Sequence, residues 1–214
     1  MKFFIYIFFI FFCATLNGFT QTAEDYLKRA NEKLDNNYAG SALNYAEQAL
    51  KIRPCYIEAY WFMGDVDLLT YNPFTIKEAI KYYDAAIACK PDLAESYLKK
   101  ANVYFILYSH SIENTTFYDS CLLYINKAFF YKPDFSDAYF LKALLYDNAK
   151  KYDEAISDYT KVIDLKNGDS KAYINRGLIK YLYKKDKAGA CDDFNKALKL
   201  GDDLAYKYIY KYCD

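Results

Sequence analysis

Residues 136–167 read SDAYFLKALLYDNAKKYDEAISDYTKVIDLKN. In the first half of this stretch, Tyr139 is followed four residues later by Ala143, and in the second half Ala155 is followed four residues later by Tyr159. An α-helix turns about 100° per residue, so residues four apart lie on the same helix face. The stretch therefore predicts two helices that each bury one small residue and one aromatic ring.

The same pattern occurs five times along the chain. In each unit a tyrosine, called here the head tyrosine, precedes by four residues a small residue, called the small slot: Tyr26 and Ala30, Tyr60 and Gly64, Tyr97 and Ala101, Tyr139 and Ala143, Tyr173 and Gly177. Successive head tyrosines are 34, 37, 42 and 34 residues apart, so the period is 34 residues with insertions of three and eight. One helix pair cannot bury its apolar face alone, but a stack of five forms a continuous core.

Proline marks the boundaries between the first units. Pro54, Pro91 and Pro133 close the second helices of the first three units, since proline cannot continue a helix. Asp92 and Asp134 follow two of these prolines and are predicted to cap the next helices.

These recurring positions resemble the tetratricopeptide repeat family, whose 34-residue unit carries large, small and aromatic residues and a closing proline in this order. Lys33, Asp67 and Lys180 depart from the pattern, because they replace an aromatic residue of the first helix. The resemblance implies an all-α, right-handed superhelical solenoid. It divides the chain into five repeats at about 23–56, 57–93, 94–135, 136–169 and 170–202, and a capping helix at 203–214.

The concave face of such a solenoid is the place where the resemblance puts function. Residues one, five and eight positions after each head tyrosine lie on the face beside the inward one, and most are apolar or aromatic. Two interpretations stay open for them: a groove for an extended or helical peptide, with Trp61 as the foremost anchor, or core between repeats. The candidate groove residues are Leu27, Asn31, Trp61, Asp65, Leu98, Asn102, Phe105, Phe140, Leu144 and Tyr181.

The family also includes clamps that hold a C-terminal carboxylate with Lys, Asn and other basic residues. In this chain only Asn31 and Lys99 match the clamp positions, and Glu95 would repel a carboxylate. We therefore expect no carboxylate clamp.

The first twenty residues differ from the rest. Lys2 is followed by an apolar, Phe-rich run and then by Gly18 and Thr20, which is typical of a secretory signal peptide. We expect residues 1–20 to be removed and the chain to be exported to a periplasm, a cell surface or the medium. An uncleaved anchor is the alternative.

Five cysteines remain after such a cleavage. Cys191 begins the second helix of the last unit and Cys213 ends the capping helix, so antiparallel packing brings the two sulfurs together. The same fold-back brings Cys55 beside Cys89. We expect disulfides in both places and a buried, free Cys121.

The sequence also predicts features of the eight-residue insertion and of the capping helix. The eight-residue insertion, within Tyr108–Phe117, predicts a polar loop that holds the only histidine, His110, either as a solvated side chain or as part of a metal site. In the capping helix, Tyr206, Tyr208, Tyr210 and Tyr212 alternate, and rings two residues apart cannot all face inward. Part of this helix is therefore expected to be an exposed aromatic surface.

Composition and motifs exclude several functions. Lys plus Arg and Asp plus Glu number 28 each, which argues against a nucleic-acid or polybasic membrane-surface protein. Catalytic motifs are absent from the sequence, so we expect a non-enzymatic scaffold without cofactor or metal and, after signal cleavage, without a membrane span. Its partner would be a protein or peptide in an envelope complex. Self-association, or service as a non-catalytic subunit of an envelope enzyme or secretion system, is the alternative.

Overall fold

The computed structural model describes residues 21–69, 73–166 and 168–213, and all regular structure in these ranges is α-helical. The predicted signal segment, residues 1–20, lies outside them. Within the described ranges no helix combines the length and the apolar character that a membrane span requires. The helices are α2 (Ala23–Asp35), α3 (Ala39–Ile52), α4 (Ile57–Leu69), α5 (Pro73–Cys89), α6 (Ala94–His110), α7 (Thr115–Tyr131), α8 (Ser136–Asn148), α9 (Tyr152–Leu165), α10 (Ser170–Leu182), α11 (Lys187–Lys199) and α12 (Asp203–Tyr212).

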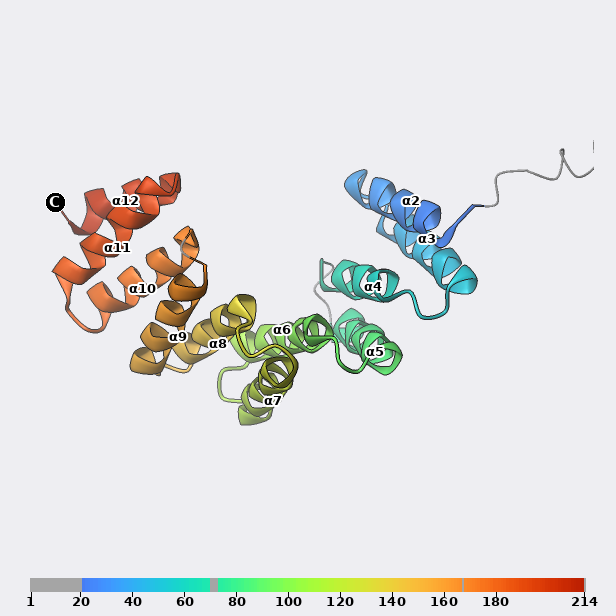
Figure 1. Ribbon diagram of the computed structural model, residues 1–214, viewed down its shortest axis with the longest axis horizontal. Helices are drawn as coiled ribbons and strands as arrows, with labels where there is room; N and C mark the ends of the chain where they lie inside the picture. The colour runs from blue at the N-terminus through green and yellow to red at the C-terminus, as the bar shows by residue number, and fades with distance from the viewer. Residues whose placement is uncertain (1–20, 70–72, 167, 214) are drawn as a thin grey trace, which may run out of the picture.

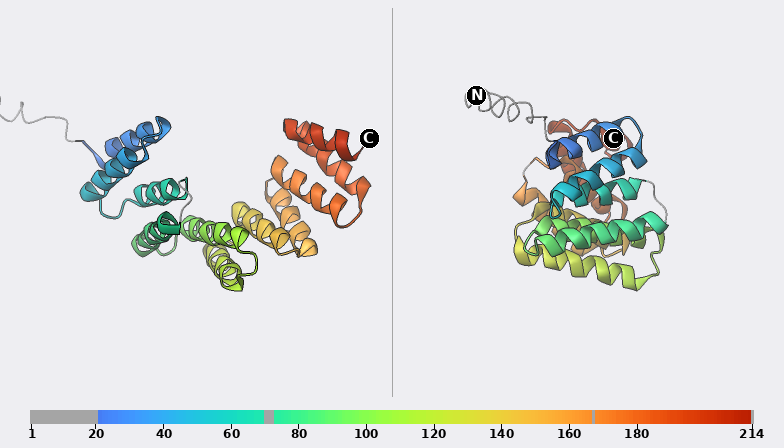
Figure 2. Two further views of the ribbon diagram at one scale, coloured as in Figure 1. Left: turned by 180° about the vertical axis from the view of Figure 1, so that it is seen from behind. Right: turned by 90° about the vertical axis from the view of Figure 1, so that its right-hand side faces the viewer.

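The helices form five antiparallel pairs and a final single helix. Each pair packs most closely within itself and then on the next pair in the chain, so the units stack in sequence order. Figure 1 shows the stack curved into an arc, with α2, α4 and α6 on its inner side and α3, α5 and α7 on its outer side. Seen along the long axis, the pairs lie one behind another (Figure 2). The predicted all-α solenoid is confirmed.

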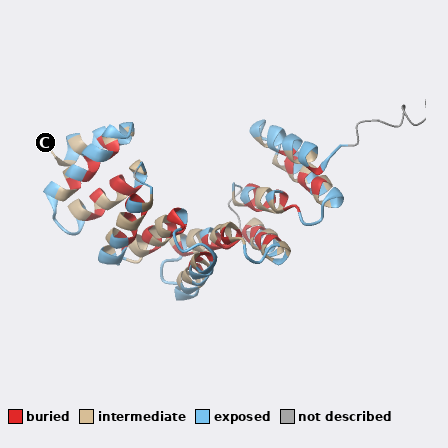
Figure 3. Ribbon diagram, viewed as in Figure 1, coloured by how far each residue is buried: buried red, intermediate tan, exposed pale blue. Residues whose placement is uncertain are grey.

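The small slots explain how the two helices of a pair approach each other. Ala30, Ala101 and Ala143 are fully buried. A Cβ atom on Gly64 would lie 2.6 Å from Cζ of Tyr83, and one on Gly177 would lie 2.7 Å from Cε1 of Phe194. In these two pairs a ring of the second helix thus lies directly over the small residue of the first helix. Buried residues line the inside of the pairs along the stack (Figure 3).

The eight-residue insertion is not the loop that the sequence predicts. α6 and α7 each contain 17 residues, whereas α8 and α10 contain 13, and only residues 111–114 connect α6 to α7. The insertion therefore lengthens both helices by about one turn. His110 is the last residue of α6, and Asn114 caps α7 by accepting a hydrogen bond from the Thr116 amide.

The predicted caps Asp92 and Asp134 are wrong by one residue. Leu93 and Phe135 hold the N-cap positions of α6 and α8, and neither side chain caps its helix. The reason is a tight turn after each second helix, in which the amide of Leu93 donates to the carbonyl of Lys90. Each aspartate lies inside this turn, one residue before the N-cap position, so its side chain does not cap the helix that follows.

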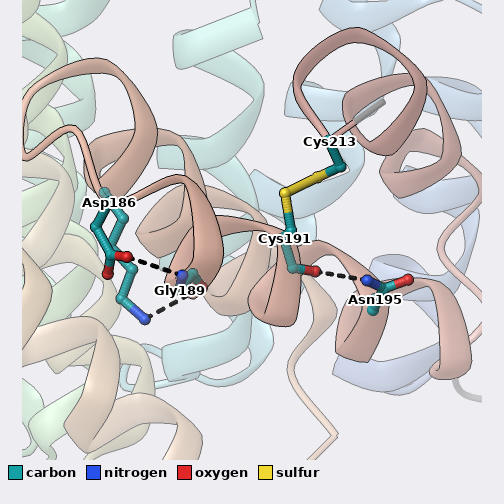
Figure 4. Close-up of a disulfide and its surroundings, with 6 residues drawn as sticks. Asp186, Gly189, Cys191, Asn195 and Cys213 are labelled. Carbon is teal, nitrogen blue, oxygen red and sulfur yellow. Dashed lines mark hydrogen bonds between the residues drawn. A yellow bond between two sulfur atoms is a disulfide. The ribbon is translucent and has the colours of Figure 1, made fainter.

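Two disulfides join the predicted cysteines. Cys55, just before α4, is bonded to Cys89 at the end of α5, with a Cα–Cα distance of 5.5 Å. Cys191 of α11 is bonded to Cys213 at the end of α12, with a Cα–Cα distance of 5.7 Å (Figure 4). Cys121 is free and buried, and burial raises the pKa of its thiol to about 12.

Candidate peptide-binding groove

A cleft of about 300 Å³ lies between the first helices of three consecutive pairs. Its walls come from α4, α6 and α8, and one ring reaches it from α5. The lining residues are Asp65, Tyr83, Leu98, Lys99, Asn102, Asp137, Phe140, Leu141 and Leu144.

The floor of the cleft is apolar. Leu98, Phe140 and Leu144 are half-buried, which leaves part of each side chain open to the cleft. The Phe140 ring packs edge-on against Tyr159, with the ring centroids 5.6 Å apart. These residues therefore pack in the core between repeats and also line the cleft.

The rim of the cleft is polar and has both charges. The Tyr83 hydroxyl donates to Oδ1 of Asp65 at 2.6 Å, and Nζ of Lys99 donates to Oδ2 of Asp65 at 2.6 Å. Asp137 accepts from Nζ of Lys166 at 2.8 Å. Burial, together with the hydrogen bond to Asp65, raises the pKa of Tyr83, so its hydroxyl stays a donor at neutral pH.

Tyr83 reaches the cleft because Gly64 leaves room for it. Its ring lies over Gly64, where a Cβ atom would approach within 2.6 Å, and its hydroxyl continues to Asp65 one residue further along α4. Packing inside the second pair thereby fixes the carboxylate at the mouth of the cleft.

Trp61, the foremost predicted anchor, does not line the cleft. Its Nε1 donates to Oγ of Ser96 at 3.0 Å, and its ring packs against a buried cluster that includes Tyr83 and Val103. Nζ of Lys99 lies 5.6 Å from the ring centroid, within reach of a cation–π interaction. The tryptophan therefore joins the second pair to the third, beside the cleft.

The cleft brings together five of the ten predicted groove residues: Asp65, Leu98, Asn102, Phe140 and Leu144. Asn31 donates to the Leu27 carbonyl on α2, at a distance from the cleft along the arc. Phe105 packs in the core of the third pair. The ring of Tyr181 packs at a tilt against Tyr212 of α12 with centroids 4.4 Å apart, so α12 covers it in part.

Sequence reasoning about the groove missed Tyr83, Lys99, Asp137 and Leu141. Asp137 lies two residues before the head tyrosine, and at 100° per residue that position falls about 20° beyond the chosen position five residues after the tyrosine, on the side away from the inward face. Extending the helical set by one position would have found it. Tyr83 could have been found from Gly64, because a glycine in the small slot admits a large ring.

No group of three or more His, Cys, Asp or Glu side chains within the described ranges is arranged to hold a metal ion. His110, the residue considered for such a site, lies at the end of α6 with its Nδ1 2.9 Å from the Ile106 carbonyl oxygen.

Residues 136–169, which contain α8 and α9, match the family model described as a tetratricopeptide repeat. The human tetratricopeptide repeat protein 13 is 25% identical over 134 residues, which cover 63% of this chain and 15% of that protein. The chain thus spans a small part of this curated relative.

Solved structures of tetratricopeptide repeat (TPR) proteins share the fold. TTC0263 from Thermus thermophilus, described as a thermophilic TPR protein, superposes with a TM-score of 0.71 at 18% identity, over 89% of this chain and 97% of that one. YrrB, described as a TPR protein with an unusual peptide-binding site, superposes with a TM-score of 0.57 at 21% identity, over 94% of this chain and 97% of that one. The family match thus covers one of the five helix pairs, and these structures show that the whole array has the fold of TPR proteins.

Proposed function

We propose that this chain is a non-catalytic scaffold that binds a segment of a partner protein in the cleft between α4, α6 and α8. TPR-type proteins generally mediate protein–protein interaction, and YrrB is described as having a peptide-binding site. The observation that carries the proposal is the cleft itself, which lies between α4, α6 and α8 and combines an apolar floor with a polar rim.

The cleft favours a segment with one bulky apolar side chain. Such a side chain would lie on Leu98, Phe140 and Leu144 and remove their open surface from water, which is the main source of affinity in sites of this kind. The exposed amide of Asn102 can both donate to and accept from the main chain of the segment. Since Asp65 is paired with Lys99 and Asp137 with Lys166, the rim does not select a strongly charged ligand.

We further propose that the chain works outside the cytoplasm, in assembly of an envelope complex. The predicted signal segment supports export, and the two disulfides support an oxidising compartment. Mass spectrometry of the protein from its native source tests this: a mature chain that begins near Gln21 is expected, and intact residues 1–20 on a chain in the cytoplasm would contradict it.

The binding site is tested by obstructing the cleft without removing core atoms. Asn102 is exposed, so Asn102→Arg adds a long side chain to the cleft and leaves Leu98 and Phe140 in place. Asn126→Arg is the matched control, because Asn126 is exposed on α7 of the same pair. Crosslinked affinity capture from the native source should lose the partner with Asn102→Arg, by roughly tenfold or more, and keep it with Asn126→Arg. Equal capture by both variants would remove the assignment.

A further inference from the structure

Asp147, in the last turn of α8, is a half-buried carboxylate that nothing in the described part of the chain neutralises. Neither a hydrogen bond nor an ion pair from the described residues reaches its side chain, and burial raises its pKa without an opposing effect of any cation. The C-terminal end of a helix also carries partial negative charge, which disfavours a carboxylate there. The fold therefore keeps a charge that destabilises it.

The second pair contains a satisfied version of the same arrangement. The Tyr83 ring lies over Gly64, and its hydroxyl donates to Asp65 at 2.6 Å. The cation comes from the next unit, where Lys99 follows the head tyrosine Tyr97 by two residues and donates to Asp65 at 2.6 Å. A ring of the second helix, a carboxylate of the first helix and a cation of the next unit thus form one group.

The fourth pair has the ring and the carboxylate but lacks the cation. Tyr159 follows Ala155 by four residues, as Tyr83 follows Ala79 by four. Its hydroxyl is fully buried and makes no hydrogen bond in the described residues. Burial and the charge of Asp147 raise the pKa of Tyr159, so the hydroxyl and the carboxylate lie near each other.

The missing cation has an identifiable position in the sequence. Two residues after the head tyrosine of the fifth pair stands Asn175, where the third pair has Lys99. The amide of Asn175 also acts on the Tyr159 hydroxyl, so this neutral side chain lies beside the same two groups. The fourth and fifth pairs therefore provide an acceptor site without the chain's own donor cation.

The other cations around Asp147 do not fill this site. Lys151 donates to a tyrosine of the third pair at 3.0 Å, and Lys150 is exposed beyond the end of α8. On α10, Arg176 and Lys180 both donate to one buried aspartate of α11, at 2.7 and 2.8 Å. The site is therefore open to a cation from outside the chain.

α8 places Asp147 in line with the floor of the cleft. Phe140, Leu144 and Asp147 are spaced by four and three residues, so they lie on one face of the helix. At 1.5 Å per residue, Asp147 is about 10 Å beyond Phe140 along the helix. An extended segment advances about 3.3 Å per residue. An apolar side chain on Phe140 and Leu144 therefore brings a side chain about two or three residues away beside Asp147.

We propose that Asp147 binds a lysine or arginine side chain of the partner segment, about two or three residues from the apolar side chain that lies in the cleft. This inference rests on the proposed function, since it concerns the same segment. The partner's cation takes the position at Asp147 that Lys99 has at Asp65. A charge-assisted hydrogen bond to a half-buried carboxylate is stronger than one between neutral groups, so this site selects the sequence of the segment.

Selection of a phage-displayed random peptide library on the immobilised full chain tests the proposal. We expect enriched peptides to combine a bulky apolar residue with lysine or arginine two or three residues away. With Asp147→Asn the apolar residue should remain, and the enrichment of lysine and arginine should fall roughly tenfold or more. Asp164→Asn is the matched control, because it removes an exposed carboxylate of α9 in the same pair and should leave the motif unchanged.

A second variant supplies the cation from within the chain. Asn175→Lys places a lysine where the third pair has Lys99, so it should also remove the preference for lysine and arginine. Circular dichroism verifies that each variant is folded. Retention of this preference in folded Asp147→Asn or Asn175→Lys would overturn the inference, as would apolar peptides without a cation on the natural chain. Loss of the proposed function itself has a different signature: no enriched peptide whose binding Asn102→Arg abolishes.

Discussion

At the scale of single residues, Gly64 couples the packing of the second pair to the surface of the cleft. The Tyr83 ring lies over it, and the Tyr83 hydroxyl holds Asp65 at the cleft mouth. A side chain at position 64 would displace the ring from the core and the hydroxyl from Asp65 together.

Gly64→Ala is expected to destabilise the protein by about 1–3 kcal/mol, because its Cβ would lie 2.6 Å from the Tyr83 ring. Gly40→Ala is the control. Position 40 is exposed on α3, with nothing within 4 Å of an added Cβ, so the higher helix propensity of alanine should stabilise the protein by about 0.5–1 kcal/mol. Urea unfolding measures both. Equal effects would show that Tyr83 does not constrain this position.

Asp147 gives a pH-dependent prediction. Burial raises its pKa in the folded protein, so the folded state binds a proton more readily than the unfolded state. Its charge therefore costs stability at neutral pH, and this cost disappears as the pH falls below the raised pKa. Asp147→Asn should raise Tm at pH 7, and the difference from the natural chain should shrink as the pH falls into the acid range.

The pKa of Glu95 is shifted in the opposite direction to that of Asp147. Burial opposes its ionisation, but the hydrogen bond from Lys132, a backbone hydrogen bond and the positive charges of Lys132 and Lys90 together outweigh burial and lower its pKa. The carboxylate therefore stabilises the fold above its unfolded pKa and loses this effect in acid. Glu95→Gln should lower Tm at pH 7, with the loss disappearing at low pH. The same pH trend for both variants would contradict the assignment of Asp147.

The residue pattern predicted the packing between helices better than it predicted which residues line the groove. Head tyrosines, small slots and both cysteine pairs follow from spacing, because close helix packing and fold-back leave few solutions. Trp61 could not be placed in the same way: its position on the helix face is common to groove and core, and only the hydroxyl of Ser96 from the next unit decides where its indole lies.

At the scale of helices, the insertions show what a sequence cannot resolve. The polar residues Ser109, His110 and Ser111 are typical of a loop, yet two of them belong to the exposed end of α6. Eight extra residues divide into about one turn for each helix, which keeps both apolar faces in phase. Polarity alone cannot separate an exposed helix end from a loop.

The Cys191–Cys213 disulfide should hold α12 in place. Cys213→Ser opens a loop with a sequence separation of 22 residues, and loop entropy predicts a loss of about 3 kcal/mol. Hydrogen exchange should rise across residues 203–212. Cys55→Ser, which opens the other disulfide, is the control and should lower stability without faster exchange in α12. Unchanged exchange in Cys213→Ser would show that aromatic packing alone holds the helix.

At the scale of the whole molecule, the two ends and the centre of the arc differ in chemistry. α2 closes one end with charged residues, α12 leaves tyrosines open at the other, and the cleft forms where three successive first helices meet. No single pair contains this cleft, since Asp65, Asn102 and Phe140 come from three units. Stacking thus creates the candidate site, which explains why the repeat pattern predicted the fold and only half of the groove.

Hydrogen exchange of the chain, alone and with its crosslink-captured partner, tests the central claim most directly. The account predicts that slowed exchange upon binding concentrates in α4, α6 and α8, and that Asn102→Arg abolishes it. Slowed exchange confined to the outer helices α7 and α9, with α4, α6 and α8 unchanged, would contradict it.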